Sequence, residues 1–399
     1  MKNINTGMSR KTQKSFKRMI SFIALLSVLT IYACNDAKID PVNYPMPVEN
    51  AENTIEADQE KETEKVEISD EEILKPEVNS FKENGTYVYN PAVIPNWILD
   101  ELQNDPKIVR AAKDVLVAIN NLEEEYTLDE DLELTEDDMR TIALVTYYTN
   151  PLSSEIILSP TDKNNVYSIM YFPYASEEES ETSSENTYIG ASPEEAKEIL
   201  DTFKDYVTDT INEKLTPDMS EKEMAAIIYE QLVIDFKFEP ESQDYYLGSN
   251  GFTEGPVKGV TDMTYTSGAN FLALYSFFLT QLHIDNRLVS GTNGFFTNDI
   301  KEKLGDRTPI SYYWVWFLLQ LDGEYYNCDI IFEKLMYNES YNGETGMAPE
   351  MTFFGMSDKK RNESYKVGKT SIFMTDSLGF ESGQTQVPEC PEDYVFIIK

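Results

Sequence analysis

The chain has 399 residues and is strongly acidic, with 71 Asp and Glu against 33 Lys and Arg and a formal net charge of −38 at pH 7. Phosphate binding needs a basic footprint, so this composition excludes nucleic acid as an expected partner. No D-x-D-x-D-G loop is present to indicate a calcium site. We therefore expect no cofactor and no metal, and a solvated exterior that resists aggregation.

Residues 1–33 have the organisation of a signal peptide. They contain six basic residues and no acid, and their apolar run, 19–33, is shorter than the roughly twenty residues that span a bilayer. The run ends in Ala33-Cys34, which resembles the lipobox of bacterial lipoproteins. This resemblance implies a lipid on Cys34, attachment to the cell membrane and an extracytoplasmic location. A cleaved secretory signal, giving a secreted protein, is the alternative, and loss of the leader changes the net charge to about −44.

Residues 34–90 are predicted to form a disordered acidic tether. Between Glu52 and Glu77 there are eleven acids against three lysines and few large apolar residues. Such a composition cannot bury enough surface to fold alone, and self-repulsion should keep it extended. We expect the tether to hold the folded part of the protein away from the membrane.

Folded sequence is predicted to begin near Pro95, with a mostly helical α+β region over 91–190. Asp105-Pro106 combines a helix N-cap with proline at the first helical position, and apolar residues follow at helical spacing. The following segments predict a capping box at Thr135, a strand over 166–174, an exposed loop over 176–186 and a helix from Ser192.

The stretch 220–329 is predicted to run helix, loop, helix and then strands. A capping box at Ser220 precedes an apolar helix, and a second, buried helix is expected to begin near Ser267. Asp322-Gly323 is a strong hairpin signal. The strands are expected over 287–291, 312–321 and, returning antiparallel after that turn, 325–331.

This order resembles the transglutaminase-like superfamily, which has a papain-like fold. The resemblance covers about a third of the chain, and the residues that carry it are Phe271, Tyr275, Ile284, Val289-Ser290-Gly291, Trp314, Asp322-Gly323, Tyr326 and Asp329. It implies an α+β fold in which a helix packs on an antiparallel sheet. The family core would occupy 191–335, and a C-terminal extension over 336–399 would pack on that core.

The reactive residues of that family are replaced in this chain. In the family a nucleophilic cysteine opens the buried helix, a histidine precedes the strand tryptophan by two residues, and an aspartate closes the next strand. Gly268 stands at the cysteine position, with Ser267 beside it, and Tyr312 stands at the histidine position. Of the triad implied by the resemblance, only Asp329 remains.

These replacements bear directly on acyl transfer, in which a histidine takes the proton of the nucleophile and later donates it to the leaving group. Gly268 offers no nucleophile. The only histidine, His283, lies about sixteen residues from Ser267, or roughly 24 Å along a helix, which is too far for a base. We therefore expect an inactive protein that binds an envelope peptide, polymer or protein, or serves as a scaffold. An unconventional acyl-transfer or peptidase-type enzyme using Ser267, Tyr312 and Asp329 is the alternative.

Each of these residues also has a purely structural interpretation. Ser267 is typical of a helix N-cap, and His283 of a favourable charge or hydrogen bond at a helix C-terminus. Tyr312 fits a half-buried strand aromatic with a partner such as Asp329, which itself could satisfy backbone donors at a strand end.

The two remaining cysteines and the C-terminal tail leave further alternatives open. Cys328 and Cys390 could form a disulfide outside the cytosol, or Cys328 could be a buried free thiol. Its place next to Asp329 on a strand makes Cys328 a poor candidate for a relocated nucleophile. Residues 394–398 could add a final strand.

Overall fold

The computed structural model describes residues 69–77, 79–163, 165–175, 188–239, 255–292, 295–305, 313–341, 346–367, 369–372 and 387–394. The predicted leader and Cys34 lie outside these residues, as do the predicted loop over 176–186 and Tyr312. Within the described ranges, no helix has the length and apolar character needed to cross a membrane. The chain forms helices and small, mainly antiparallel sheets, so the predicted α+β class is confirmed.

A four-stranded antiparallel sheet lies in the C-terminal half of the chain. Its order is β11 (Glu324–Cys328), β10 (Tyr313–Leu321), β8 (Asp285–Thr292) and β13 (Lys369–Ile372). Asp322 and Gly323 join β10 to β11 with φ values of 51° and 86°, the left-handed backbone that a two-residue hairpin turn requires. The predicted hairpin is confirmed.

The predicted return strand over 325–331 ends earlier than expected. β11 stops at Cys328, and α13 (Ile330–Tyr341) begins two residues later. The reason is a helix cap, because the Asp329 carboxylate accepts a hydrogen bond from the backbone N–H of Phe332, 2.9 Å away. A carboxylate at this position turns the chain from strand into helix.

Two predicted helices pack around the sheet and α13. They are α9 (Glu221–Asp235), which starts with the predicted capping box at Ser220, and α11 (Gly268–Gln281), which has Ser267 as its N-cap. Tyr275 of α11 joins these layers. Its ring centroid lies 5.6 Å from that of Tyr229 on α9 and 5.2 Å from that of Phe317 on β10. Its hydroxyl donates to the carbonyl of Ala225 on α9.

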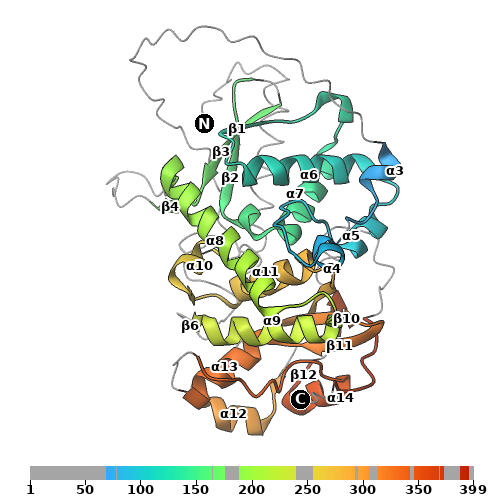
Figure 1. The fold of residues 1–399 in the computed structure, drawn as a ribbon, viewed down its shortest axis with the longest axis vertical. Helices are drawn as coiled ribbons and strands as arrows, with labels where there is room; N and C mark the ends of the chain where they lie inside the picture. Colours follow the sequence, from blue (N-terminus) through green and yellow to red (C-terminus); the bar gives the residue numbers. More distant parts are fainter. Residues whose placement is uncertain are drawn as a thin grey trace, which may run out of the picture.

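The N-terminal half combines two predicted helices with a three-stranded antiparallel sheet. α7 begins with the capping box at Thr135, whereas Asp105 precedes α6 without a side-chain cap. These elements are drawn in the upper part of Figure 1, and α8 runs from there toward α9 and α11. Their bounds are α6 (Pro106–Asn120), α7 (Glu136–Thr149), β1 (Glu125–Thr127), β2 (Ile156–Pro160), β3 (Val166–Tyr171) and α8 (Pro193–Lys214).

Shorter elements connect these units. They are α5 (Asn96–Glu101), η1 (Glu130–Leu132), η2 (Pro151–Ser154), β4 (Tyr174–Ala175), β5 (Tyr188–Ile189), β6 (Lys237–Phe238), α10 (Lys258–Asp262), β7 (Thr264–Tyr265), β9 (Phe295–Phe296), α12 (Asn298–Leu304), α14 (Asp358–Ser364) and β12 (Tyr365–Lys366). Of the predicted final strand over 394–398, only Tyr394 is described, and it belongs to no strand.

One continuous hydrophobic core connects the two halves. Phe203 of α8 lies 5.4 Å, between ring centroids, from Phe277 of α11, and Tyr89 contacts both rings. The predicted N-terminal region and family core therefore share their packing. α13 also crosses the predicted boundary between residues 335 and 336.

The predicted tether over 34–90 is wrong from residue 69 onward. α3 (Asp70–Ile73) and α4 (Ser80–Asn84) form there, and the side chain of Phe81 is buried at 2% exposure. The Asn79 amide donates to the carbonyl of Leu282, 2.8 Å away. The acidic composition predicted disorder, but a few apolar side chains of this segment are buried against the rest of the core.

We predict that Phe81→Ala lowers the free energy of unfolding by about 3–5 kcal/mol, because it leaves a cavity in the shared core. Val88→Ala is the control, since Val88 is 66% exposed and belongs to the same segment. It should change the free energy of unfolding by less than about 0.5 kcal/mol. Urea unfolding measures both, and equal small effects would place this segment outside the core.

Candidate functional site

The sheet topology puts three of the positions that the family resemblance singles out toward one end of the sheet, where Trp314 and Asp329 are hydrogen-bonded. β10 and β8 are antiparallel, and α11 leads directly into β8, so α11 and β10 run in the same direction. Tyr275 and Phe317 contact each other midway along these elements. The start of α11, the start of β10 and the residue after β11 thus lie at one end of the sheet, and they carry Gly268, Trp314 and Asp329.

Asp329 is wholly buried at that end, with 0% exposure. One carboxylate oxygen accepts from Trp314 Nε1 at 2.6 Å, and the other accepts from the backbone N–H of Phe332. Burial raises the pKa of this carboxyl to about 6, and these two hydrogen bonds act against that rise. Its main chain is also bonded, because the Tyr229 hydroxyl donates to the Asp329 carbonyl at 2.9 Å.

These bonds give Asp329 a structural role that joins four segments. Its carboxylate fixes the tryptophan of β10 and the first turn of α13, its carbonyl fixes α9, and its N–H donates to the carbonyl of Phe353, 2.9 Å away. The predicted partner Tyr312 is outside the described residues. Trp314 of β10 is a partner that the sequence analysis missed.

Ser267 and Gly268 form the start of the buried helix. The Ser267 hydroxyl oxygen accepts from the N–H of Ala269 at 3.3 Å, and its side chain is 7% exposed, so the predicted N-cap is confirmed. Gly268 is buried and contributes only backbone. At the expected position of a nucleophile, the chain therefore has a capping hydroxyl and a glycine.

His283 lies at the opposite end of α11, as expected. Its backbone N–H donates to the carbonyl of Thr280 at 3.0 Å, and its φ of 58° turns the chain out of the helix. Burial lowers the pKa of the imidazole, although the nearby Glu77 acts against that effect. This helix-end hydrogen bond is made by the backbone, and the lowered pKa of the imidazole acts against the predicted charge.

Two buried ionisable residues follow Asp329 on α13, and the sequence analysis did not identify them. Glu333, one turn on, is 2% exposed and accepts from the N–H of Phe353 at 2.7 Å. Burial raises its pKa to about 7. Lys334 is 0% exposed, donates to the carbonyl of Val233 at the end of α9 at 2.6 Å, and has its pKa lowered by burial to about 7. The signal for Glu333 was its helical spacing of four residues from Asp329, which the overlong strand prediction hid.

Cys328 and Cys390 are both free and buried, so the predicted disulfide is wrong and the free-thiol alternative is confirmed. The Cys328 sulfur accepts from the N–H of Gly355 at 3.2 Å, and burial raises the pKa of the thiol. The Cys390 N–H instead donates to the Asp358 carboxylate at 3.0 Å, and the Cys390 carbonyl accepts from the Asp358 N–H.

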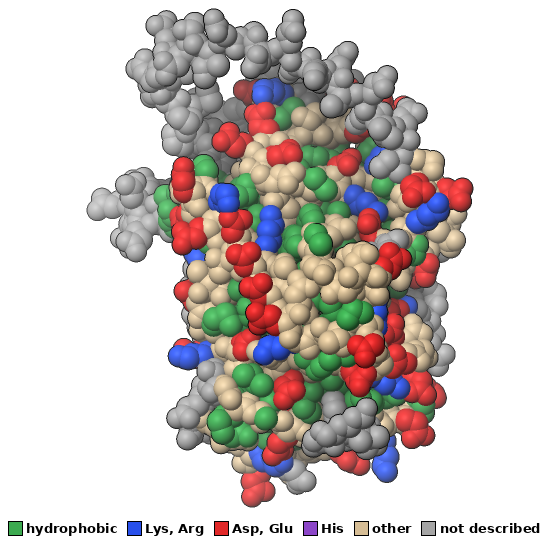
Figure 2. All heavy atoms as spheres, viewed as in Figure 1, with side chains coloured by type: hydrophobic (Ala, Val, Ile, Leu, Met, Phe, Trp, Pro, Cys, Tyr) green, Lys and Arg blue, Asp and Glu red, His purple; other side chains and the backbone are tan. Residues whose placement is uncertain are grey.

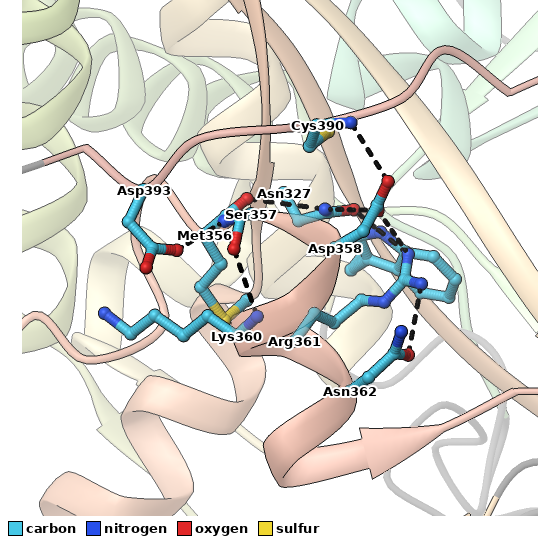
Figure 3. A network of polar contacts seen from close by, with 10 residues as sticks. Asn327, Met356, Ser357, Asp358, Lys360, Arg361, Asn362, Cys390 and Asp393 are labelled. Carbon is cyan, nitrogen blue, oxygen red and sulfur yellow. Dashed lines mark hydrogen bonds and ion pairs between the residues drawn. The ribbon is translucent and has the colours of Figure 1, made fainter.

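Figure 3 shows this second polar network, in which the C-terminal segment lies against α14. The Asn327 amide donates to Asp358 at 3.0 Å, and Arg361 donates to Asn327 at 3.2 Å. The guanidinium also lies over the ring of Trp316, with 4.9 Å from its central carbon to the ring centroid. The network binds residues 387–394 to the sheet edge, in agreement with the predicted packing of the C-terminal extension.

An open volume lies elsewhere, in the N-terminal half. A cavity of about 410 Å³ is bordered by β3, the segment after β5 and the first turn of α8. Among the described residues, no group of three or more His, Cys, Asp or Glu side chains is arranged to hold a metal ion.

Comparison with known proteins gives the chain no family. No protein-family model matches it, and a search of curated proteins returns no match.

The raised pKa of Glu333 predicts a pH-dependent contribution to stability. Its folded pKa of about 7 exceeds the unfolded value of about 4.3, so the native state binds the extra proton. The stabilisation that comes from this proton is complete below the unfolded pKa and is lost as the pH rises through the folded pKa of about 7. Glu333→Gln stays neutral and can still accept from Phe353. Its free energy of unfolding, relative to that of the wild type, should therefore rise by at least about 1 kcal/mol from pH 5 to pH 8.

Urea unfolding of both proteins at these two pH values measures that gain. The exposed Glu363→Gln is the control and should show the same difference from the wild type at both pH values. A Glu333→Gln difference that does not change with pH would mean that the native carboxyl already carries its charge at pH 5.

Proposed function

We propose that this protein is an extracytoplasmic, membrane-anchored member of the transglutaminase-like superfamily that has lost catalysis and acts as a binding or scaffold module at the cell envelope. One observation carries the loss of catalysis. The Asp329 carboxylate is fully buried and bonded to Trp314 Nε1 and to the Phe332 N–H.

The order of elements supports the family assignment. A buried helix, α11, leads into β8, and β8 pairs antiparallel with β10, which forms the hairpin with β11. The positions of the tryptophan on β10, of the Asp-Gly turn between β10 and β11, and of the aspartate directly after β11 support the resemblance.

The geometry at that end supports binding or scaffolding over acyl transfer. A nucleophile needs a base within hydrogen-bond reach, and that base needs an orienting group. Ser267 uses its oxygen to cap α11, Gly268 has no side chain, and the Asp329 carboxylate accepts hydrogen bonds from Trp314 and Phe332. These hydrogen bonds of Ser267 and Asp329 are therefore ones that hold the fold.

We predict that the purified full-length protein shows no amide hydrolysis or amine transfer on glutamine-containing peptides. Ser267→Ala should leave this background unchanged and lower the free energy of unfolding by about 1 kcal/mol, the usual value of an N-cap hydroxyl. Product release measured by mass spectrometry, together with urea unfolding, tests both statements. Turnover that Ser267→Ala removes would favour the alternative enzyme that uses Ser267, Tyr312 and Asp329.

The membrane anchor is tested separately. In a bacterial host with lipoprotein processing, the protein should sediment with membranes and carry a lipid, and Cys34→Ala should abolish both properties. Cys390→Ala removes a thiol from the folded part and should leave both unchanged. Fractionation and mass spectrometry of the N-terminal peptide measure the outcome, and a lipid-free N-terminus beginning after residue 33 would indicate the secreted alternative.

A further inference from the structure

The cavity in the N-terminal half is apolar on most of its surface. Its apolar wall is formed by Leu122, Ile169, Met170, Ala191, Pro193 and Ala196. β3 is the middle strand of its sheet, yet its residues 166–170 are all only half-buried. A central strand normally has at least one face covered by the core, so this exposure marks apolar surface that is left open.

The apolar surface continues onto the neighbouring β-ribbon. Tyr174 of β4 and Ile189 of β5 are cross-strand partners. Their exposed fractions are 41% and 44%, and they are two of the five large hydrophobic residues exposed in the described part of the chain. The ribbon adjoins the cavity in sequence on both strands, since Tyr171 and Gly190 line it. Two exposed apolar side chains thus stand beside an apolar hollow.

Acidic side chains extend from this hollow along α8. The first turn of α8 borders the cavity through Pro193 and Ala196, and the helix is about 33 Å long. Figure 2 shows acidic side chains in a line that follows α8 across the visible face. This acidic face consists of Glu194, Glu198, Asp201, Asp205, Asp209 and Glu213, at spacings of three and four residues.

We propose that the cavity and the acidic face of α8 together bind a cationic amphipathic polypeptide segment. One or two large apolar side chains of the segment occupy the cavity between β3 and α8. Its Lys or Arg side chains lie along the acidic face. This arrangement is helix-in-groove recognition, in which an amphipathic helix places its apolar side chains in a groove.

The charge and the length of α8 favour a cationic polypeptide segment as the ligand. Opposite charge favours a cation along α8, because six acids face solvent or lie partly exposed there. Among the described residues, Asp201 is the one of these six that forms an ion pair, with Lys197. A small molecule could fill the cavity, but it would leave the acidic face unoccupied. A helix of about 20 residues spans roughly 30 Å, which is close to the length of α8, whose first turn borders the cavity.

The test uses a synthetic 20-residue peptide of leucine and lysine at helical spacing, labelled with a fluorophore. Fluorescence anisotropy with the purified full-length protein measures its Kd at low and high salt. One comparison peptide has its lysines replaced by glutamate, and another has its leucines replaced by serine. We expect only the original peptide to bind, with an affinity that falls as salt rises.

Two pairs of variants separate this site from the general acidity of the protein. Glu198→Lys with Asp205→Lys should weaken binding by about tenfold or more. Glu302→Lys with Glu363→Lys makes the same change in net charge on α12 and α14 and should weaken binding by less than about twofold. An equal loss in both pairs would show that only the net charge attracts the peptide and would overturn the proposal.

The cavity is tested with Ala191→Phe, which fills it, and with Ile189→Ser, which changes only an exposed residue of the ribbon. Both should weaken binding, and Ile189→Ser keeps the test valid if Ala191→Phe does not fold. Unchanged binding in both would overturn the proposal. A neutral apolar dye that binds this cavity and that the peptide does not displace would indicate a small apolar ligand instead. Neither result bears on the loss of catalysis, since the two sites share no residue.

Discussion

The buried carboxylate of Asp329 is the constraint on which the C-terminal half of the fold depends. Burying a charge is costly unless donors replace the water it loses, and Trp314 and Phe332 supply those donors. The same residue ends β11, starts α13 and connects α9 through Tyr229. A change of this side chain would therefore remove the bonds to β10 and to the first turn of α13, whereas the bonds to α9 and to Phe353 are made by the main chain.

This dependence gives Asp329 a role in folding that requires no catalysis. In a catalytic triad the aspartate acts through a histidine, which it holds in the orientation needed for proton transfer. Here its partners are an indole and a helix terminus, so the aspartate is needed for folding whether or not chemistry takes place. Ser267 has a comparable structural role, because its hydroxyl caps α11.

Elements encoded by neighbouring residues were predictable from the sequence. The capping boxes at Ser220 and Thr135 and the Asp322-Gly323 turn depend on contacts within a few residues, so local spacing was sufficient. The first turn of α13 was missed because Asp329 looks like the end of a strand until its bond to Phe332 is known. The folded segment around Phe81 was missed because its burial is provided by residues far along the chain.

The acidic face of α8 differs from Asp329, because its carboxylates are exposed or only partly buried. Like charges three and four residues apart repel each other and destabilise a helix. α8 tolerates them because its other face is firmly buried, with Phe203, Val207 and Ile211 each at 0% exposure. Burial of the apolar face thus stabilises the helix enough for the opposite face to carry like charges. Because a cation bound there would relieve the repulsion, the helix is stabilised by the class of partner that its surface selects.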